Sequence, residues 1–321
     1  MNLNNVDSAN CKVSEQGLCQ GPPAEKKLRD LYVQSYRSRM DVLNMTCRAG
    51  MGHIGSDFSC LDILTALYFG VIKVDPEDPF CPERDRFILS KGHASGALYA
   101  TLAARGFFPK AWLATYQQFD SRLQGHPDRR RLPGVEHNTG SLGHGLSVAT
   151  GMAAGLKFLA RECLQVPRVF VLLGDGELQE GSNWEAAMLA AHLKLENLVA
   201  IVDRNGLQQG DSTEATVGLE NLAAKWESFG WEVKQCDGHD MRELLKVLDA
   251  PEKTVDRPRV VIARTVKGSG VGFMENEPAW HHRVPSADEE AKASEEIEEL
   301  LARLEGNEAE WQTSVKRSSK H

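Results

Sequence analysis

Apolar residues recur at helical spacing near the start of the chain, at Leu28, Leu31, Tyr36, Met40 and Leu43. Steps of three and four residues place such side chains on one face of a helix, so we predict a helix over residues 25–48. The same pattern over residues 57–69, ending before Gly70, predicts a second helix. Residues 1–24 are polar and lack this periodicity, and we expect them to form a disordered leader.

Further along, short and wholly apolar segments alternate with longer amphipathic ones. The predicted strands are residues 86–89, 168–173, 198–202, 231–233 and 259–263, and helices are predicted over 145–163, 183–193, 219–229 and 241–248. Strands that are apolar throughout are buried on both faces. We therefore predict an α/β fold, a doubly wound parallel sheet with helices on both faces, which binds its ligands at the carboxyl ends of the strands.

This domain is expected to span residues 25–285, and an acidic tail follows it over 286–321. The tail holds ten acidic and five basic residues, and Ile297, Leu300, Leu301 and Leu304 lie at helical spacing. The pattern predicts an amphipathic helix that docks on the domain or on a partner.

Charge and cysteine usage narrow the class of protein. A net charge of -8 argues against nucleic-acid binding, which needs a basic face. No signal peptide or membrane span is expected. The seven cysteines are scattered and contain no C-x-x-C pair, so we expect reduced thiols and a cytoplasmic protein.

The clearest chemical signal is the turn Gly174-Asp175-Gly176 between a predicted strand and a predicted helix. Glycines allow an anion to approach the backbone, and a helix start offers free N–H groups to phosphate. Asp175 is itself negative, so its presence there implies a bridging cation, most simply Mg²⁺. Asn205 follows the next predicted strand, thirty residues after Asp175 (205 − 175 = 30), and offers a second oxygen ligand.

Two other interpretations of this turn compete with a cation site. Gly174-x-Gly176, with Asp203 at the end of the next strand, imitates the dinucleotide fingerprint G-x-G-x-x-G, but Gln179 stands where the third glycine belongs. A tight turn without function is the other alternative, and taken alone the motif leaves it open.

The wider sequence resembles the amino-terminal region of the transketolase family from about Arg29 to Pro285. The motifs that carry the resemblance are Gly50-Met51-Gly52-His53-Ile54-Gly55, Ser90-Lys91-Gly92-His93-Ala94-Ser95, Gly125-His126-Pro127, Thr139-Gly140-Ser141-Leu142-Gly143-His144-Gly145, the Gly174-Asp175-Gly176 turn with Asn205, and Ala279-Trp280-His281. This resemblance implies thiamine diphosphate and Mg²⁺ as cofactors, with Ca²⁺ or Mn²⁺ as possible substitutes.

The resemblance also implies residue roles. Asp175, Asn205 and the carbonyl of Leu207 match metal ligands. His93, His281 and the N–H of Gly176 match diphosphate contacts, and Gly140 and Leu142 match residues along the cofactor rings. His53, His126 and His281 match imidazoles that contact sugar hydroxyls and shuttle protons, and Glu180 matches an acid that acts across a subunit interface.

Some positions stay ambiguous or depart from the family pattern. A shift of one residue would exchange His281 with His282, and Ser182-x-x-Glu185 reads equally as a capping box at a helix start. The family usually has Gly-Pro-Leu where this chain has Gly140-Ser141-Leu142, and Gly-Gln-Gly where it has Gly143-His144-Gly145. These departures put the substrate side in doubt rather than the cofactor.

In the family, the glutamate that activates the cofactor lies in a second, pyrimidine-binding domain beyond the region matched here. We therefore expect a split transketolase, in which this chain is the N-terminal subunit. With a C-terminal subunit it would form a heterotetramer that moves a two-carbon ketol unit from a ketose phosphate to an aldose. The alternatives are a deoxyxylulose-phosphate synthase and a non-catalytic, cofactor-binding regulatory subunit.

Overall fold

The computed structural model describes residues 24–160, 166–249 and 256–306. Its centre is a five-stranded parallel sheet in the order β1-β2-β3-β7-β6. The strands are β1 (Arg86–Leu89), β2 (Val169–Gly174), β3 (Leu198–Arg204), β7 (Arg259–Arg264) and β6 (Glu232–Asp237). β2 and β3 are neighbours, and Gly174 stands opposite Asp203 at their carboxyl ends.

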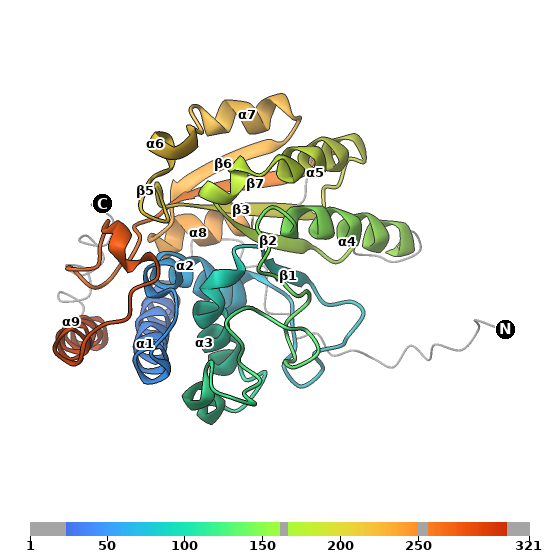
Figure 1. The fold of residues 1–321 in the computed structure, drawn as a ribbon. Coiled ribbons are helices and arrows are strands. Elements are labelled where there is room, and N and C mark those ends of the chain that lie inside the picture. The colour runs from blue at the N-terminus through green and yellow to red at the C-terminus, as the bar shows by residue number, and fades with distance from the viewer. Residues whose placement is uncertain (1–23, 161–165, 250–255, 307–321) are drawn as a thin grey trace.

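Side chains of β2 alternate between two cores because successive residues of a strand point to opposite faces. Val169, Val171 and Leu173 join one core with α4 (Gly145–Leu159), α5 (Gly181–His192) and α7 (Leu222–Ser228). Phe170 and Leu172 join the other core with α1 (Glu25–Ala49), α2 (Ile54–Ala66), α3 (Ser95–Arg105) and α8 (Met241–Leu248). Helices thus cover both faces of the sheet (Figure 1), which confirms the predicted fold class.

The predicted helices and strands are present among the described residues, with shifts at their ends, whereas the leader predicted over 1–24, except its last residue, and the end of the helix predicted over 145–163 lie outside the described residues. α2 begins at Ile54, three residues before the predicted start, and α5 begins at Gly181. The helix start indicated by Ser182-x-x-Glu185 is confirmed, but the capping box itself does not form, because the Ser182 hydroxyl donates to the carbonyl of Gly143 at 2.7 Å. α3 was not predicted.

Short elements complete the chain between the main helices and strands. They are η1 (Leu67–Val71), η2 (Gly92–Ala94), η3 (Lys110–Thr115), η5 (Gly176–Gln179), β4 (Leu207–Gln208), β5 (Asp211–Ser212), α6 (Thr213–Val217) and η6 (Pro278–His281). β4 and β5 pair as a small antiparallel hairpin directly after β3.

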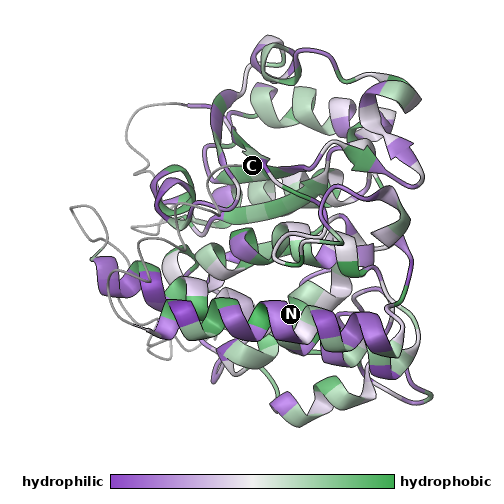
Figure 2. Cartoon of the chain, turned by 90° about the vertical axis from the view of Figure 1, so that its left-hand side faces the viewer, coloured by the Kyte–Doolittle hydropathy of each residue, from purple (hydrophilic) through white to green (hydrophobic). Residues whose placement is uncertain are grey.

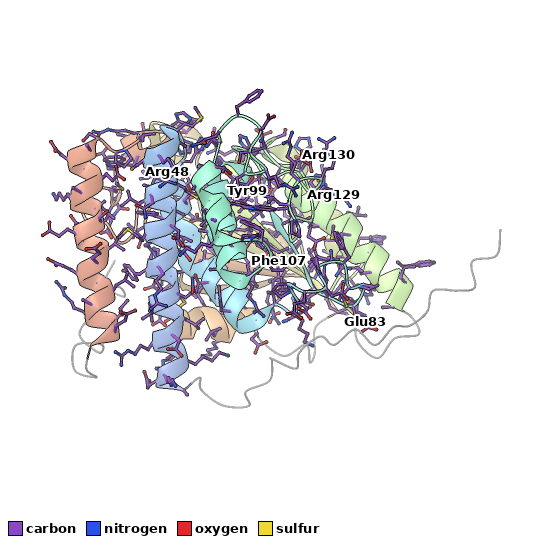
Figure 3. The ribbon with its side chains drawn as sticks, turned by 90° about the horizontal axis from the view of Figure 1, so that it is seen from below. Arg48, Glu83, Tyr99, Phe107, Arg129 and Arg130 are labelled. Atoms are coloured by element: carbon purple, nitrogen blue, oxygen red, sulfur yellow. The ribbon has the colours of Figure 1, made fainter. Side chains whose placement is uncertain are left out.

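The acidic tail forms α9 (Ala287–Glu305), which docks on the domain along α1. Ser286 and Glu289 form a capping box at its start, and Ile297 and Leu304 enter the same core as α1. α9 faces the viewer in Figure 2 and carries both hydrophilic and hydrophobic residues. Figure 3 shows α1 lying between α9 and α3. The helix was expected to dock on the domain or on a partner, and the structure shows it docked on the domain.

One expectation from composition needs correction and another needs a closer look. Residues Ile54–Val71 are long and apolar enough for a membrane span, but this segment is buried within the domain as a core helix, so it does not overturn the expectation that the chain has no membrane span. Cys47, Cys60 and Cys236 are free thiols, whereas Cys81 is disulfide-bonded, so the expectation of seven reduced cysteines is wrong at that position.

Candidate functional site

The loops after β2 and β3 meet at the carboxyl edge of the sheet through Asp175. One carboxylate oxygen of Asp175 accepts the N–H of Gly176 at 2.8 Å. The other accepts the N–H of Gly206 at 2.7 Å and a guanidinium N–H of Arg204 at 3.1 Å. The amide oxygen of Asn205 accepts the N–H of Leu207 at 3.0 Å. The predicted metal ligands Asp175, Asn205 and Leu207 therefore lie in one connected pair of loops.

The chemistry of these donors suits a hard divalent cation. Burial raises the pKa of Asp175, with the nearby Asp203 carboxylate adding to the effect, and the Arg204 guanidinium and the N–H groups of Gly206 and Gly176 offset only part of it, so a cation bound here would further stabilise its charge. A carboxylate, an amide oxygen and a backbone carbonyl are ligands that Mg²⁺ accepts. In the described part of the chain, no three His, Cys, Asp or Glu side chains are grouped to hold a metal, which leaves this mixed oxygen set as the candidate.

Glu177 fastens the loop of Gly140 and Leu142 to the Gly174-Asp175-Gly176 turn. Its buried carboxylate accepts the N–H of Gly143 at 2.9 Å and that of Gly174 at 3.0 Å, and it also accepts the hydroxyl of Ser90. The Ser90 hydroxyl in turn accepts the N–H of Gly145 at 3.1 Å. One side chain thus holds together three loops that carry predicted site residues.

Gly140 and Leu142 lie on the open side of this loop. Gly140 has a φ of +148°, and a Cβ there would stand 3.2 Å from the ring of His126, so the site requires glycine. Leu142 is exposed, and so is Glu180 at the start of α5. An exposed leucine and an exposed acid beside a buried loop are available to a ligand or to a second chain.

Five imidazoles from four segments gather next to these loops. The ring of His53 lies 5.3 Å from His93, 6.5 Å from His126, 5.7 Å from His281 and 4.7 Å from His282, between centroids. His93 and His281 are 5.4 Å apart. The structure thus brings together every predicted active-site histidine and adds His282.

Most of these imidazoles have no hydrogen-bond partner among the residues that the structure describes. His93, His126 and His282 form no side-chain hydrogen bond to the described residues, and Nδ1 of His53 is buried without a partner. Burial lowers the pKa of His53 to about 4 and that of His93 well below its usual value. Neutral, unpartnered imidazoles around one space are available to bind a polar ligand and to exchange protons with it.

His281 differs because a lysine fixes its protonation pattern. The ammonium of Lys267 lies 2.8 Å from Nδ1 of His281. Burial, with the neighbouring ammonium groups, lowers the pKa of His281 to about 3, so the ring is neutral. Burial likewise lowers the pKa of Lys267, to about 8, which leaves it largely protonated at neutral pH. Lys267 therefore donates to Nδ1, and Nε2 of His281 carries the proton.

Beneath the histidines, Lys91 and Asp203 form a fully buried ion pair. Asp203 also accepts the hydroxyls of Ser59, at 2.6 Å, and of Thr265. Burial alone would raise the pKa of Asp203, and the Lys91 ammonium lowers it instead. Because its oxygens are occupied inside the core, Asp203 cannot bind the ribose of a dinucleotide, and the dinucleotide alternative fails here.

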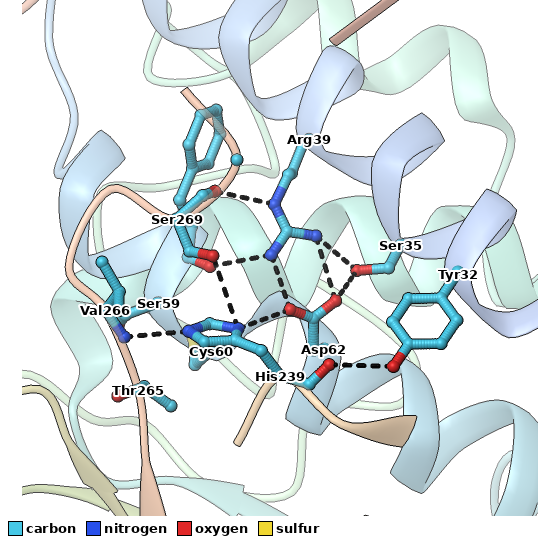
Figure 4. Close-up of polar contacts among 12 residues, drawn as sticks. Tyr32, Ser35, Arg39, Ser59, Cys60, Asp62, His239, Thr265, Val266 and Ser269 are labelled. Carbon is cyan, nitrogen blue, oxygen red and sulfur yellow. Dashed lines mark hydrogen bonds and ion pairs between the residues drawn. The ribbon is translucent and has the colours of Figure 1, made fainter. Parts of the chain in front are cut away.

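A second buried network anchors the loop that carries Lys267 (Figure 4). The Arg39 guanidinium contacts the Asp62 carboxylate at 2.7 Å and the Ser269 carbonyl at 2.9 Å. Asp62 also accepts from Ser35, at 2.5 Å. Burial opposes the charge of Asp62, but Arg39 lowers its pKa. α1, α2 and the loop after β7 are joined in this way.

His239 completes this network. Nδ1 of His239 lies 2.7 Å from a carboxylate oxygen of Asp62, and Nε2 accepts the N–H of Val266 at 2.8 Å. Both ring nitrogens are thus occupied, and the second bond lies one residue before Lys267. The network holds the backbone from which Lys267 reaches His281.

Sequence reasoning missed Lys91, Lys267, Glu177 and Ser90. Lys91 and Ser90 lie within the quoted Ser90-Lys91-Gly92-His93 motif, and Glu177 directly follows the Gly174-Asp175-Gly176 turn. Lys267 comes three residues after β7, at the edge where ligands bind in such sheets. A charged residue close to the end of an apolar strand was the signal available.

Comparisons with known proteins all point to one family. A family model described as transketolase, thiamine diphosphate binding domain, matches residues 33–299. The chain is 47% identical over 266 residues to one subunit of the apulose-4-phosphate transketolase of Actinobacillus succinogenes, covering 83% of this chain and 94% of that protein. It is 39% identical to human transketolase, covering 81% of this chain and 40% of the human protein.

A solved transketolase from Leishmania mexicana superposes with a TM-score of 0.79 and 26% identity, over 90% of this chain and 45% of that one. The chain thus spans less than half the length of the human and Leishmania transketolases and nearly all of the Actinobacillus protein. The chain belongs to the transketolase family, as an N-terminal subunit that comprises the thiamine diphosphate binding domain.

Proposed function

We propose that this chain and a C-terminal partner together transfer a two-carbon ketol unit from a ketose phosphate to an aldose. The observation that carries the proposal is the convergence of unpartnered imidazoles on the edge of the sheet where Asp175 and Asn205 lie. A site of this kind offers an anion-holding turn on one side and proton donors and acceptors on the other.

We assign the diphosphate end of the cofactor to the loops after β2 and β3. Asp175, Asn205 and the carbonyl of Leu207 would hold Mg²⁺, or Ca²⁺ or Mn²⁺ in its place, and the N–H of Gly176 with His93 and His281 would contact the diphosphate. Gly140 and Leu142 would lie along the rings, where glycine lets the cofactor approach the backbone. Bound there, thiamine diphosphate would supply the electron sink that breaking a carbon–carbon bond beside a carbonyl group needs.

The histidines of this chain bind and move protons around the sugar. His53, His126 and His281 are assigned to its hydroxyl and carbonyl oxygens. His281 presents Nε2–H as a donor because Lys267 occupies Nδ1. The neutral His53 can accept a proton through its unpartnered Nδ1. A donor and an acceptor at one substrate are what reversible cleavage of the ketose carbon–carbon bond needs.

The C-terminal partner is assigned to an exposed apolar surface on α4 and α5, which lie side by side (Figure 1). Phe158 and Leu159 of α4 and Met188, Leu189 and Leu193 near α5 are exposed there. Several large apolar side chains together on a surface mark an interaction site. Glu180, exposed at the start of α5, would reach the activating glutamate of the partner. Two such pairs would form a heterotetramer with two-fold symmetry.

Mixing the purified chain with its candidate partner tests the function. The donors to assay are xylulose 5-phosphate together with apulose 4-phosphate and 6-deoxy-6-sulfofructose, compounds taken from the names of relatives. We expect no transfer by the chain alone, tight cofactor binding and transfer by the mixture, and a heterotetramer by sizing. Leu189→Asp, which places a charge on the apolar surface, should weaken assembly, whereas Glu220→Ala, at an exposed position outside α4 and α5, should not.

Transfer by the isolated chain would overturn the split-enzyme proposal. Assembly without transfer from any donor would favour the non-catalytic regulatory alternative. A cytoplasmic location is also proposed: the three free thiols support it, the disulfide at Cys81 argues against it, and cell fractionation tests it.

A further inference from the structure

His282 stands in the imidazole cluster although no role was assigned to it. Its ring is nearly perpendicular to that of His53, at 75°, and the separation of 4.7 Å is shorter than those from His53 to the other three imidazoles. His282 is exposed, whereas its neighbour His281 is half-buried and held by Lys267. His282 therefore occupies the outer side of the cluster and His281 the inner side.

The backbone at His282 is fixed on both sides even though the side chain is exposed. Trp280 is buried, and its indole N–H donates to the carbonyl of Phe273 at 3.1 Å. A Cβ at Gly55 would stand 2.7 Å from the Trp280 carbonyl, so the start of α2 packs closely on this segment. Arg283 stacks over the Trp280 ring at 4.4 Å and pairs with Glu289 at 2.6 Å. The imidazole is thus presented from a clamped segment.

A structural histidine in this protein has a different environment. His239 is buried and both of its nitrogens are occupied. His282 forms no hydrogen bond to the described residues, so nothing in that part of the protein uses its donor or its acceptor. An exposed imidazole on a clamped backbone, without a hydrogen-bond partner among the described residues and beside other imidazoles, is placed to bind a polar ligand.

We propose that His282 is a substrate-binding residue that hydrogen-bonds a hydroxyl of the sugar phosphate at the outer end of the site. This inference rests on the proposed function. Because His282 lies farther out than His281, it contacts atoms of the sugar that do not react. Its loss should therefore raise KM and leave kcat and cofactor affinity nearly unchanged.

Two variants separate the hydrogen bond from the ring. His282→Phe keeps a ring beside His53 and removes both nitrogens, whereas His282→Asn keeps a donor and an acceptor. In the assembled two-subunit enzyme, we expect His282→Phe to lower kcat/KM about 3- to 10-fold through KM, as loss of one net hydrogen bond does, and His282→Asn to retain most of it. Circular dichroism and thermal melting check that both variants fold.

Equal KM values for the wild type and His282→Phe would overturn the proposal, and so would a loss of thiamine diphosphate affinity in that variant. Calorimetric titration of each assembly with the ketose phosphate measures the affinity for the sugar independently of turnover. If the wild-type assembly transfers nothing, the proposed function fails, but the contact of His282 can still be tested by sugar binding. Weaker binding of the sugar phosphate by His282→Phe than by the wild type would support that contact, and equal binding would overturn it.

Discussion

The molecule holds two polar clusters that differ in how their hydrogen-bonding groups are satisfied. In the network of Arg39, Asp62 and His239, the carboxylate and both imidazole nitrogens have protein partners (Figure 4). In the imidazole cluster around His53, most ring nitrogens have none among the described residues. Buried polar groups in native proteins are nearly always paired. The first cluster therefore belongs to the fold itself, and we expect a ligand to complete the second.

The two clusters are also connected. The N–H of Val266 donates to His239, and Lys267, the next residue, contacts His281. The network of Arg39, Asp62 and His239, whose polar groups are paired, thus fixes the backbone that positions Lys267 and His281 in the imidazole cluster. Such support keeps the geometry of a binding site in place without its ligand. The predictions below change one cluster or the other.

The largest effect is expected from Asp175→Ala, which removes the carboxylate ligand of the proposed cation. Without that charge the diphosphate has no bridge to the turn, and we expect Mg²⁺-dependent thiamine diphosphate binding to be abolished. Calorimetry of the assembled enzyme with Mg²⁺ measures it. Asp211→Ala, on the adjacent hairpin and exposed, is the matched control and should bind normally. Unchanged affinity in the Asp175 variant would remove the assignment of the metal site.

Asp62→Ala should act on stability instead. It leaves the fully buried Arg39 guanidinium and Nδ1 of His239 without their carboxylate. Breaking one partner of a buried pair costs about 3–5 kcal/mol, so the free energy of unfolding should fall by that order. Urea unfolding measures it.

The control for Asp62→Ala is Glu299→Ala, which breaks the exposed pair with Arg303 on α9. Such pairs contribute under about 1 kcal/mol. Similar losses in the two variants would mean that the buried network does not stabilise the fold.

The same contrast explains what the sequence could predict. Strands such as 259–263 were recognisable because apolar runs follow from local chemistry. The turn at Asp175 was recognisable because glycines and a carboxylate at a strand end have few other uses. α3 was missed, although the Ser90-Lys91-Gly92-His93 motif directly before it was used.

What the sequence did not predict depends on long-range pairing. Asp203 and Lys91 are 112 positions apart, and Asp62 and His239 are 177 apart. No local pattern links such residues. Asp203 could be misread as a ribose ligand for this reason, and His282 could not be separated from His281 until their neighbours were known.

A smaller effect is expected from His126→Ala in the assembled enzyme. His126 lies on the exposed side of the cluster against Gly140, and it is assigned to the sugar. Loss of its contact should lower turnover about 10- to 100-fold, within the range of a strong hydrogen bond to a reacting group, with cofactor affinity kept. Steady-state kinetics and a cofactor titration on one preparation separate these effects. Weak cofactor binding with normal turnover at saturation would contradict the assignment.

The smallest effect concerns pH and stability. An unfolded histidine binds a proton below its ordinary pKa of about 6.5. Burial, with His282 and His126 nearby, lowers the pKa of folded His53 to about 4. Between these values the unfolded state holds more protons, so stability is greatest above pH 6.5 and falls as the pH is lowered toward 4.

His53→Gln should remove part of this pH dependence, because glutamine does not titrate. Urea unfolding at pH 7.5 and pH 5.0 measures it. The unfolding midpoint of the wild type should fall further between these two pH values than that of the variant. Asp62→Ala, which breaks the network of Arg39 and His239, should lower the unfolding midpoint at both pH values. Equal falls of the midpoint in His53→Gln and the wild type would mean that the fold does not keep His53 neutral. The imidazole cluster would then not differ from the Asp62 network in its electrostatics, and the comparison between the two clusters would lose that support.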